Sequence, residues 1–583
     1  MDSHSRRLAS STRETAPDDS LPRRPWRRGL AGVALAFSGL LFVAIDNAAA
    51  ATAAGSTSPY VVTSAQRGDP SAIRHEVACI KAYAADPKNN YTNYAPAIGA
   101  PEVTDAIHSG LQPCATFTGT VTGRNQVAQF LSPYVYPGGI QIVVFGGPKQ
   151  AFLIGGAPGT PVAGYTDGPY IARFNPGTGK QVWKTFLPLL PGQWILPPSM
   201  AVVKGGWVAA AVGPTIYKLH PQTGAIVRSQ EQTLSAGRPV DVNLDGYAVS
   251  PDAGGAILMK TQTRSTGCPI QGSNAMSFCI PQFGPQPNST VIAADPVTLK
   301  TIASIQLDQS VTARPTLVSH NGMTYMYLAG ATQGIRVIWN PKTKTLTQDP
   351  TWTPTYLLPG QGAGDAPVPL GSWVIFNTNA ITSTTVPICA VAVSQSDANV
   401  WRRACPWGRT LPPGMVSEQP ASFSTDPEND MFFMQDWLVG GVFAMHLNQK
   451  TGAMKVVWSR PDWRTSDYLN SIGPANHRVV VSQKLQSDFT SANANSGEWQ
   501  ESVLWVDQKT GKTLAQSAIN GPSAPAWMIE PGYAGRMYAL GTDGTLHLFS
   551  VSACTRRSSP PLTPASLTSC PPPPPSSPPR VTG

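Results

Sequence analysis

Charged residues are scarce in this 583-residue sequence, at 13% of the chain, about half the share of an average soluble protein. This scarcity excludes a coiled coil and a charged disordered chain, because both need many charged side chains. After residue 54 the sequence has no apolar run long enough to span a bilayer, which excludes a polytopic membrane protein. The Lys and Arg residues are scattered and form no basic stripe, so we expect no nucleic-acid partner.

Familiar catalytic and metal-binding motifs are also missing. The sequence has no His-Glu-x-x-His, no Gly-x-Ser-x-Gly and no Cys-x-x-Cys, and its eight His are dispersed. The Gly511-Lys512-Thr513 string resembles the end of a phosphate-binding loop, but Val506 stands where that loop needs its first glycine. We therefore predict no catalytic residue and no metal site.

The N-terminus has the composition of an export signal. Four Arg residues within 23–28 precede an apolar run at 29–45, and small residues follow at 47–54. A basic region, an apolar region and an Ala-x-Ala site are the parts of a secretory signal peptide; the alternative is an uncleaved membrane anchor. In both cases we expect the rest of the chain to be exported, to the extracellular space or the cell envelope.

Changes in composition divide the chain into four expected parts. Residues 1–54 are the signal or anchor, 55–118 a small helical segment, 119–550 a repeat region and 551–583 a tail. The tail holds ten Pro, five of them consecutive, which is typical of a solvated, disordered polyproline segment.

Two helices are expected before the repeats. Asp69 and Pro70 supply an N-cap and a first-turn proline for a helix at 71–85. A second helix is expected at 101–109, ended by Gly110. The segment could cover one face of the fold or bind a partner.

Eight Cys in an exported protein favour disulfides. Local pairing is only a preference, because eight cysteines allow many connectivities. It predicts four bonds: Cys79–Cys114, Cys268–Cys279, Cys389–Cys405 and Cys554–Cys570. The first would staple the helical segment.

Short β-rich runs recur, each followed by an Asp, Asn or Pro turn start and usually by a Gly where a positive φ is needed. The clearest examples are 171–183, 216–224, 291–299, 337–344, 442–452 and 503–511. Earlier in some units an Asp-Gly or Asn-Gly dipeptide, as at Asp245-Gly246 and Asn321-Gly322, predicts a tight hairpin turn. Four antiparallel strands in each such unit are typical of a propeller blade.

We therefore expect an all-β fold, a β-propeller of four-stranded antiparallel blades. The late turns give eight blades, or seven if one unit is not a blade. Ala115–Val121 is the expected strand that closes the ring. The blades are expected near Gly179, Gly224, Leu299, Lys344, 394–399, Gly452, Gly511 and Asp543-Gly544.

The strand followed by Asp/Asn-Pro-x-Thr-Gly-Lys-x-x-Trp resembles the repeat of pyrroloquinoline-quinone-type propellers over about 119–550. That superfamily includes quinoprotein alcohol dehydrogenases and non-enzymatic scaffolds such as the outer-membrane assembly lipoprotein. The Trp that ends this repeat pattern, which we call the docking Trp, is present at Trp183. Trp458 lies two residues further from its turn glycine than the pattern requires. Other residues fill the equivalent position elsewhere, namely Arg228, Ala303, Gln348 and Ala515. The chain is thus a divergent relative.

The resemblance to the dehydrogenases implies features that this sequence does not show. Those enzymes typically carry a disulfide between adjacent cysteines at the cofactor, and many have a Cys-x-x-Cys-His haem site; both are missing here. Their Ca²⁺ ligands and catalytic Asp cannot be placed residue by residue. No cofactor is therefore predicted, and pyrroloquinoline quinone with calcium enters only under the dehydrogenase alternative.

Isolated residues support further hypotheses. The segment 241–246 resembles half of a calcium loop, but hairpin chemistry explains it better. Asp365 and Asn379 are candidates for polar groups in a propeller channel, and His220 and His446 are expected to be structural. Four Trp are the candidates for exposed sugar-stacking faces, Trp401, Trp407, Trp437 and Trp463.

The sequence leads to one preferred function and two alternatives. The preferred function is an exported, non-catalytic binding or scaffold propeller whose partner is an envelope protein or glycan. The alternatives are a quinone-dependent dehydrogenase with an atypical site and a carbohydrate-binding propeller. A membrane contact is expected only through the N-terminal segment, if it stays uncleaved.

Overall fold

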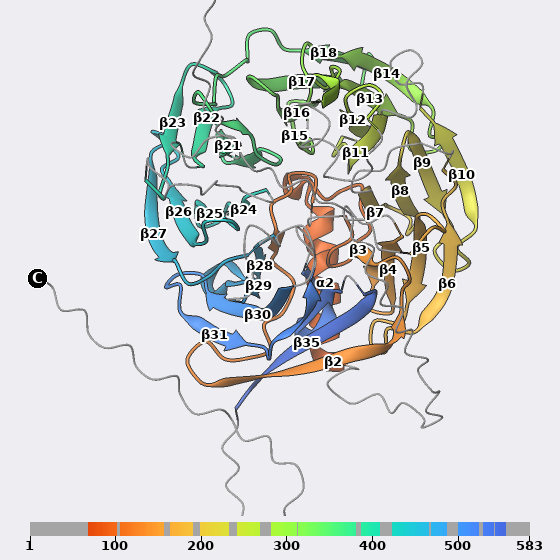
Figure 1. Cartoon of the computed structure of the whole chain (residues 1–583), viewed down its shortest axis with the longest axis vertical. Coiled ribbons are helices and arrows are strands. Elements are labelled where there is room, and N and C mark those ends of the chain that lie inside the picture. The colour runs from red at the N-terminus through yellow and green to blue at the C-terminus, as the bar shows by residue number, and fades with distance from the viewer. Residues whose placement is uncertain are drawn as a thin grey trace, which may run out of the picture. The chain divides into compact units, whose positions relative to one another are not determined.

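The computed structural model separates the chain into two units, Met1–Tyr60 and Val61–Gly583, and the described residues all belong to the second. These residues are 68–101, 105–156, 164–189, 199–232, 242–252, 254–268, 282–311, 313–380, 386, 388–408, 422–465, 468–486, 499–523, 529–541 and 543–554. They form eight antiparallel sheets arranged in a ring, which is a β-propeller (Figure 1).

Blades 1 to 4 each contain four strands, named in order from the axis outward. Blade 1 has β3 (Ile140–Gly147), β4 (Gln150–Gly155), β5 (Tyr170–Phe174) and β6 (Gln181–Phe186). Blade 2 has β7 (Ser199–Val202), β8 (Val208–Val212), β9 (Thr215–Leu219) and β10 (Ile226–Glu231). Blade 3 has β11 (Val242–Val249), β12 (Ile257–Thr263), β13 (Thr290–Ala294) and β14 (Thr301–Gln306). Blade 4 has β15 (Thr316–His320), β16 (Met323–Ala329), β17 (Gly334–Asn340) and β18 (Thr345–Gln348).

Blades 5 to 8 are less regular. In blade 5, β19 (Gly362–Ala363) and β20 (Val368–Leu370) both pair with β21 (Trp373–Asn379), followed by β22 (Ala390–Ser394) and β23 (Trp401–Ala404). Blade 6 has β24 (Ser424–Asp426), β25 (Met431–Gln435), β26 (Val442–Leu447) and β27 (Met454–Arg460). Blade 7 has β28 (Asn470–Ile472), β29 (Val479–Leu485), β30 (Trp499–Asp507) and β31 (Thr513–Gln516), with β1 (Leu111–Gln112) and β32 (Asn520–Ser523) added. Blade 8 has β33 (Glu530–Pro531), β34 (Arg536–Leu540), β35 (Thr545–Ala553) and β2 (Asn125–Val135).

The count of eight blades confirms the predicted fold, but the closing strand was predicted wrongly. The strand that closes the ring is β2, which pairs with β35 from Asn125 opposite Ala553 to Val135 opposite Thr545. Residues 115–121 form no strand. The reason lies in their contacts, since the Thr116 amide donates to Glu76 and the Thr118 hydroxyl donates to the Val551 carbonyl.

Closure by β2 also changes the meaning of the eighth turn. In blades 1 to 7 the predicted turns join the third strand to the outermost strand. Asp543-Gly544 instead joins β34 to β35, the second and third strands of blade 8, because the outermost strand comes from the N-terminal side.

The late turns of blades 1 to 4, 6 and 7 share a left-handed residue at the same position. In blade 1 the Asn175 side chain accepts hydrogen bonds from the amides of Gly177 and Thr178, and Gly179 has a φ of 72°. Leu299 and Lys344 adopt the same left-handed conformation, with φ of 61° and 55°, where the repeat has lost its glycine.

The two predicted hairpin dipeptides differ in structure. Asn321 and Gly322 form the tight turn between β15 and β16, both with positive φ, as predicted. Asp245 and Gly246 instead lie inside β11, at an irregularity of its pairing with β12, so the hairpin turn predicted there was wrong. A Cβ on Gly246 would lie 2.1 Å from Pro315 Cδ, so this glycine permits a close approach of the next blade.

Aromatic donors connect neighbouring blades. Four Trp side chains donate through Nε1 to a backbone carbonyl in the late turn of the following blade, and Tyr136 donates its hydroxyl in the same way. The pairs are Trp183 to Pro221, Trp352 to Ser394, Trp373 to Gln449, Trp458 to Gln508 and Tyr136 to Gly179. Trp458 therefore docks despite its late position.

The N-terminal segment begins with α2 (Pro70–Ala85), whose N-cap is Asp69, as predicted. Three short 3₁₀ helices also occur, η1 (Pro87–Asn89), η2 (Ala475–His477) and η3 (Tyr533–Gly535). The described residues 105–109 form no helix, so the helix expected there was wrong. Their carbonyls bond to the blades instead: the Ala106 carbonyl accepts from the Leu317 amide, and the Ser109 carbonyl accepts from the Thr425 amide. No helix in the described part of the chain is long and apolar enough to cross a membrane.

Disulfides join two of the expected pairs, Cys79–Cys114 and Cys389–Cys405. Cys268 and Cys554 are also disulfide-bonded, and Cys279 and Cys570 lie outside the described residues. The Cys79–Cys114 bond attaches α2 to the stretch that precedes β2.

The Trp458 donor gives a test of the blade contacts. We expect Trp458→Phe to lower the free energy of unfolding by about 1 kcal/mol, because the Gln508 carbonyl loses its donor while the apolar contact stays. Urea denaturation measures the change. Trp401→Phe, at a side chain that is 40% exposed, is the matched control and should change it by less than about 0.5 kcal/mol. Equal losses in both variants would contradict this role for Trp458.

Candidate functional site

The site lies at the axis of the ring, where part of the N-terminal segment is threaded. We call residues 91–101 and 105–112 the axial segment. It hydrogen-bonds to seven of the eight blades, from 1 to 4 and from 6 to 8. The blade partners, in that order, are Phe145 with Gly99, Val202 with Ala100, Val249 with Tyr94, Leu317 with Ala106, Thr425 with Ser109, Ser471 with Gly110 and Tyr533 with Ile98.

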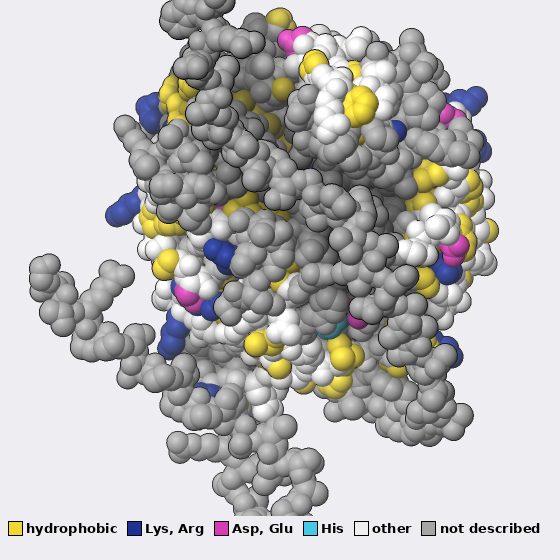
Figure 2. Space-filling model, in the orientation of Figure 1, with side chains coloured by type: hydrophobic (Ala, Val, Ile, Leu, Met, Phe, Trp, Pro, Cys, Tyr) yellow, Lys and Arg dark blue, Asp and Glu magenta, His cyan; other side chains and the backbone are white. Residues whose placement is uncertain are grey.

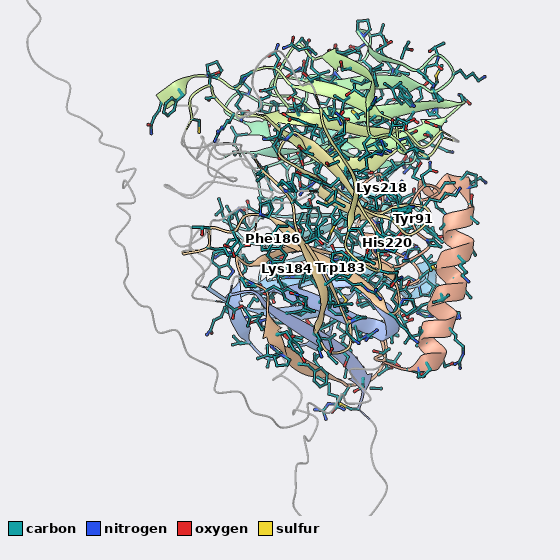
Figure 3. All side chains as sticks on the ribbon, turned by 90° about the vertical axis from the view of Figure 1, so that its right-hand side faces the viewer. Tyr91, Trp183, Lys184, Phe186, Lys218 and His220 are labelled. Atoms are coloured by element: carbon teal, nitrogen blue, oxygen red, sulfur yellow. A yellow bond between two sulfur atoms is a disulfide. The ribbon has the colours of Figure 1, made fainter. Side chains whose placement is uncertain are left out.

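The two faces of the ring differ. The turn face carries the connections between first and second strands and the late turns. Helix α2 lies along this face (Figure 3). The Glu76 carboxylate on α2 accepts from the Ala534 amide in η3, and Asn93 donates to the carbonyls of Ser250 and Asp252. The opposite loop face carries the connections between second and third strands and those between blades.

A buried set of polar side chains lies at the loop-face end of the axis. We call Asp245, Lys260, Arg314, Asp365 and Tyr468 the axial cluster. Lys260 Nζ lies 2.9 Å from Asp245 Oδ2, and the guanidinium of Arg314 lies 3.9 Å from Asp245 Oδ1 and 3.8 Å from Asp365 Oδ2. The Tyr468 hydroxyl donates to Asp365 Oδ2 at 2.9 Å and accepts from Arg314 at 3.1 Å. These contacts join blades 3, 4, 5 and 7 at the axis.

Strand geometry explains how the cluster assembles. Asp245 and Lys260 are paired neighbours on β11 and β12. Arg314, Asp365 and Tyr468 stand in the connections that lead into the innermost strands of blades 4, 5 and 7. These connections all reach the axis on the loop face, so residues far apart in the sequence meet there.

Lys260 is fully buried, and its surroundings offset the cost of burying a charge. Its ammonium donates to Gln262 Oε1 at 2.6 Å and to the Val311 carbonyl at 3.0 Å, in addition to the Asp245 pair. Burial lowers the pKa of Lys260, and the Asp245 carboxylate acts in the opposite direction.

His108 of the axial segment faces this cluster. Its Nε2 lies 3.1 Å from the Pro315 carbonyl oxygen, and the side chain is buried. Burial, followed by the positive charge of Arg314, lowers the pKa of His108 to about 4, while Asp365 and Asp245 oppose the shift. The imidazole is therefore neutral near pH 7 and carries its proton on Nε2, leaving Nδ1 as an acceptor.

The sequence identified only part of this site. Asp365 is a polar group at the axis, whereas Asn379 ends β21 opposite Gly362. Lys260, Arg314 and Tyr468 were missed. A lysine inside the apolar strand β12 was the available signal, because an unpaired buried lysine would be costly.

Other predicted residues lie elsewhere. Trp401 is 40% exposed and Trp407 is half-buried, but Trp437 and Trp463 are buried, so the expectation that they offer exposed stacking faces was wrong. The Trp463 Nε1 donates to the Gln483 carbonyl within the protein. His220 accepts from the amides of Gln222 and Thr223 in a late turn, which is a structural role. Among the described residues, no group of three or more His, Cys, Asp or Glu is arranged to hold a metal ion.

Comparisons with known proteins give matches among solved structures alone. No protein-family model and no curated protein matches the chain. A solved structure of BamB from Moraxella catarrhalis is 12% identical, covers 73% of this chain and 98% of its own, and has a TM-score of 0.41. The quinohemoprotein alcohol dehydrogenase ADHIIG from Pseudomonas putida HK5 is 10% identical, covers 84% of each chain and has a TM-score of 0.46. Both names belong to the kinds of propeller that the turns resemble, but at these identities and TM-scores neither match assigns a function to this chain.

The low pKa of His108 predicts a pH dependence. A buried neutral histidine contributes stability that is present above its unfolded pKa, near 6.5, and is lost as the pH falls towards 4. The difference in unfolding free energy between wild type and His108→Gln should therefore shrink by up to about 3 kcal/mol over this range. Urea denaturation at each pH measures it. Asp105, whose pKa burial raises to about 6, is present in both proteins and cancels. A constant difference would contradict the prediction.

Proposed function

We propose that this chain is an exported, non-catalytic propeller that binds a protein or glycan of the cell envelope through its loop face. The observation that carries the proposal is that the chain covers its own turn face. Helix α2 and the start of the axial segment lie on that side, where Glu76 accepts from Ala534 of blade 8 and Asn93 donates to Ser250 and Asp252 of blade 3. The loop face is thus the side that the N-terminal segment leaves for a partner.

The described charged side chains visible on the loop face carry both signs. On the face shown in Figure 2, the described Lys, Arg, Asp and Glu side chains are scattered, mostly near the rim. A partner recognised by shape and hydrogen bonds fits this surface better than a polyanion such as nucleic acid. Phe283, in the connection between β12 and β13, adds an exposed aromatic side chain, 41% accessible, of the kind enriched in protein interfaces.

The cysteines support the proposed export. Disulfides persist in oxidising compartments, and the described residues contain the bonds Cys79–Cys114 and Cys389–Cys405. The N-terminal signal or anchor at 1–54 lies outside the described residues and remains part of the proposal.

The quinone-dependent alternative fits the axial residues poorly. Pyrroloquinoline quinone carries several carboxylates and needs unbalanced positive charge. Lys260 and Arg314 already face Asp245 and Asp365, so the cluster offers no net charge for it. The sequence also lacks the adjacent cysteines that the dehydrogenases place at the quinone. We therefore derive no reaction step through this cofactor.

Surface sugar stacking, the second alternative, loses part of its basis with the burial of Trp437 and Trp463. A carbohydrate site at these side chains would need them exposed.

Site-specific photocrosslinking tests the proposed binding face. A benzoylphenylalanine at Asp167 or Phe283, both exposed on the loop face, should capture one recurring partner from envelope extracts. The matched controls, at Lys342 and Thr223 in exposed late turns of the turn face, should not capture it. Capture from the turn-face positions would contradict the proposed orientation.

A second assay separates binding from catalysis. The purified chain is titrated with pyrroloquinoline quinone and Ca²⁺, followed by thermal shift and by dye reduction with alcohols and sugars. We expect neither stabilisation nor dye reduction. Saturable stabilisation together with dye reduction would replace the proposal with the dehydrogenase alternative.

A further inference from the structure

We propose that the axial cluster is a binding site for a neutral, polyhydroxylated molecule of the sugar class, with His108 Nδ1 accepting a hydroxyl proton. The proposal does not depend on the loop-face partner, because it concerns side chains buried at the axis. It rests on the charge balance of the cluster and on buried polar atoms that the described protein leaves without partners.

The charge balance selects against ionic ligands. Two cationic side chains, Lys260 and Arg314, face two carboxylates, Asp245 and Asp365, at 2.9 to 3.9 Å. An added anion would meet Asp245 and Asp365, and an added cation would meet Lys260 and Arg314. A neutral ligand leaves these pairs intact and avoids the cost of burying an unpaired charge.

Four polar atoms beside the cluster have no hydrogen-bond partner in the part of the chain that the structure describes. They are His108 Nδ1, Thr316 Oγ1, Ser422 Oγ and Ser424 Oγ, on residues that are at most 4% exposed. Buried polar atoms are nearly always hydrogen-bonded, so a group of them calls for an occupant that completes their bonds.

Contacts place these atoms around the same region. Thr316 follows Pro315, whose carbonyl meets His108 Nε2. The Ser422 amide donates to Asp365 Oδ2, the oxygen that also meets Tyr468. Ser424 lies two residues further along, against the axial segment, where a Cβ on Gly110 would lie 2.4 Å from its Oγ. Blade 6 and the axial segment thus contribute beside blades 3, 4, 5 and 7.

The chemistry of the atoms identifies the class of ligand. With its proton on Nε2, His108 can only accept at Nδ1 and needs an O–H or N–H donor. The hydroxyls of Thr316, Ser422 and Ser424 can each donate or accept. Vicinal hydroxyls, which also donate and accept, satisfy both requirements at once without adding charge. Water shares this chemistry, and the experiment separates water from a sugar.

The test is a thermal-shift and calorimetric titration of the full-length protein. The probes are D-glucose, D-galactose, D-mannose, myo-inositol and trehalose, at up to about 10 mM, ten times a weak dissociation constant of about 1 mM. Sodium sulfate and sodium succinate are the anionic probes. We expect at least one neutral probe to raise Tm saturably, with no effect of the anions.

Variants locate the binding. His108→Phe should weaken the binding of that probe about tenfold or more, because Nδ1 is lost and the ring fills its space. His547→Phe is the matched control, since His547 is another buried histidine whose Nδ1 lacks a partner among the described residues but lies in β35 of blade 8; its affinity should stay at the wild-type value. If His108→Phe does not fold, the double variant Thr316→Val and Ser422→Ala removes two hydroxyls at nearly constant size and should give the same loss.

Each other result overturns the proposal. If no neutral probe shifts Tm, the unpartnered atoms hold water only. If the anions alone bind, the cluster is an anion site. If a sugar binds equally to wild type and to the axial variants, its site lies elsewhere.

Discussion

Pairing of β2 with β35 is the contact on which the ring depends. Asn125 lies opposite Ala553 and Leu131 opposite His547, so the N-terminal side of the chain supplies the outermost strand of blade 8. The rest of that blade is small, since β33 has two residues and β34 has five. Because closure leaves only short outer edges, the other seven blades keep fixed neighbours on both sides.

The axial segment precedes β2 in the chain, and it passes along the axis before the chain reaches the outermost strand of blade 8. The innermost strands of a propeller present amide and carbonyl groups to the axis, where water access is limited. The backbone carbonyls of Gly99, Ala106 and Gly110 accept hydrogen bonds from amides of these innermost strands. Charged side chains then gather at the loop-face end, where they compensate one another.

The fold could be read from the sequence because its turns are local. The Asn175 turn is specified by its own side chain and by Gly179, and its copies recur in sequence. Leu299 and Lys344 keep the conformation without glycine because the surrounding turn holds it. Closure by β2 could not be predicted, because its partner Ala553 is distant in the sequence. The position of Asp245-Gly246 inside a strand could not be predicted either, because the contact that fixes Gly246 is with Pro315, also distant in the sequence. The axial cluster was mostly missed for the same reason, since no local pattern joins Lys260, Arg314 and Tyr468.

The chain order of blade 8 has a consequence for biogenesis. Its outermost strand, β2, is synthesised before its inner strands. The partner of β2 is β35, so β2 cannot pair until nearly the whole chain has been synthesised. Long-range pairing of this kind makes folding slow. A truncated chain that stops before β35 would lack the partner of β2 and leave that strand as an unpaired edge. Only a chain that includes β35 can therefore pair β2 and close the ring.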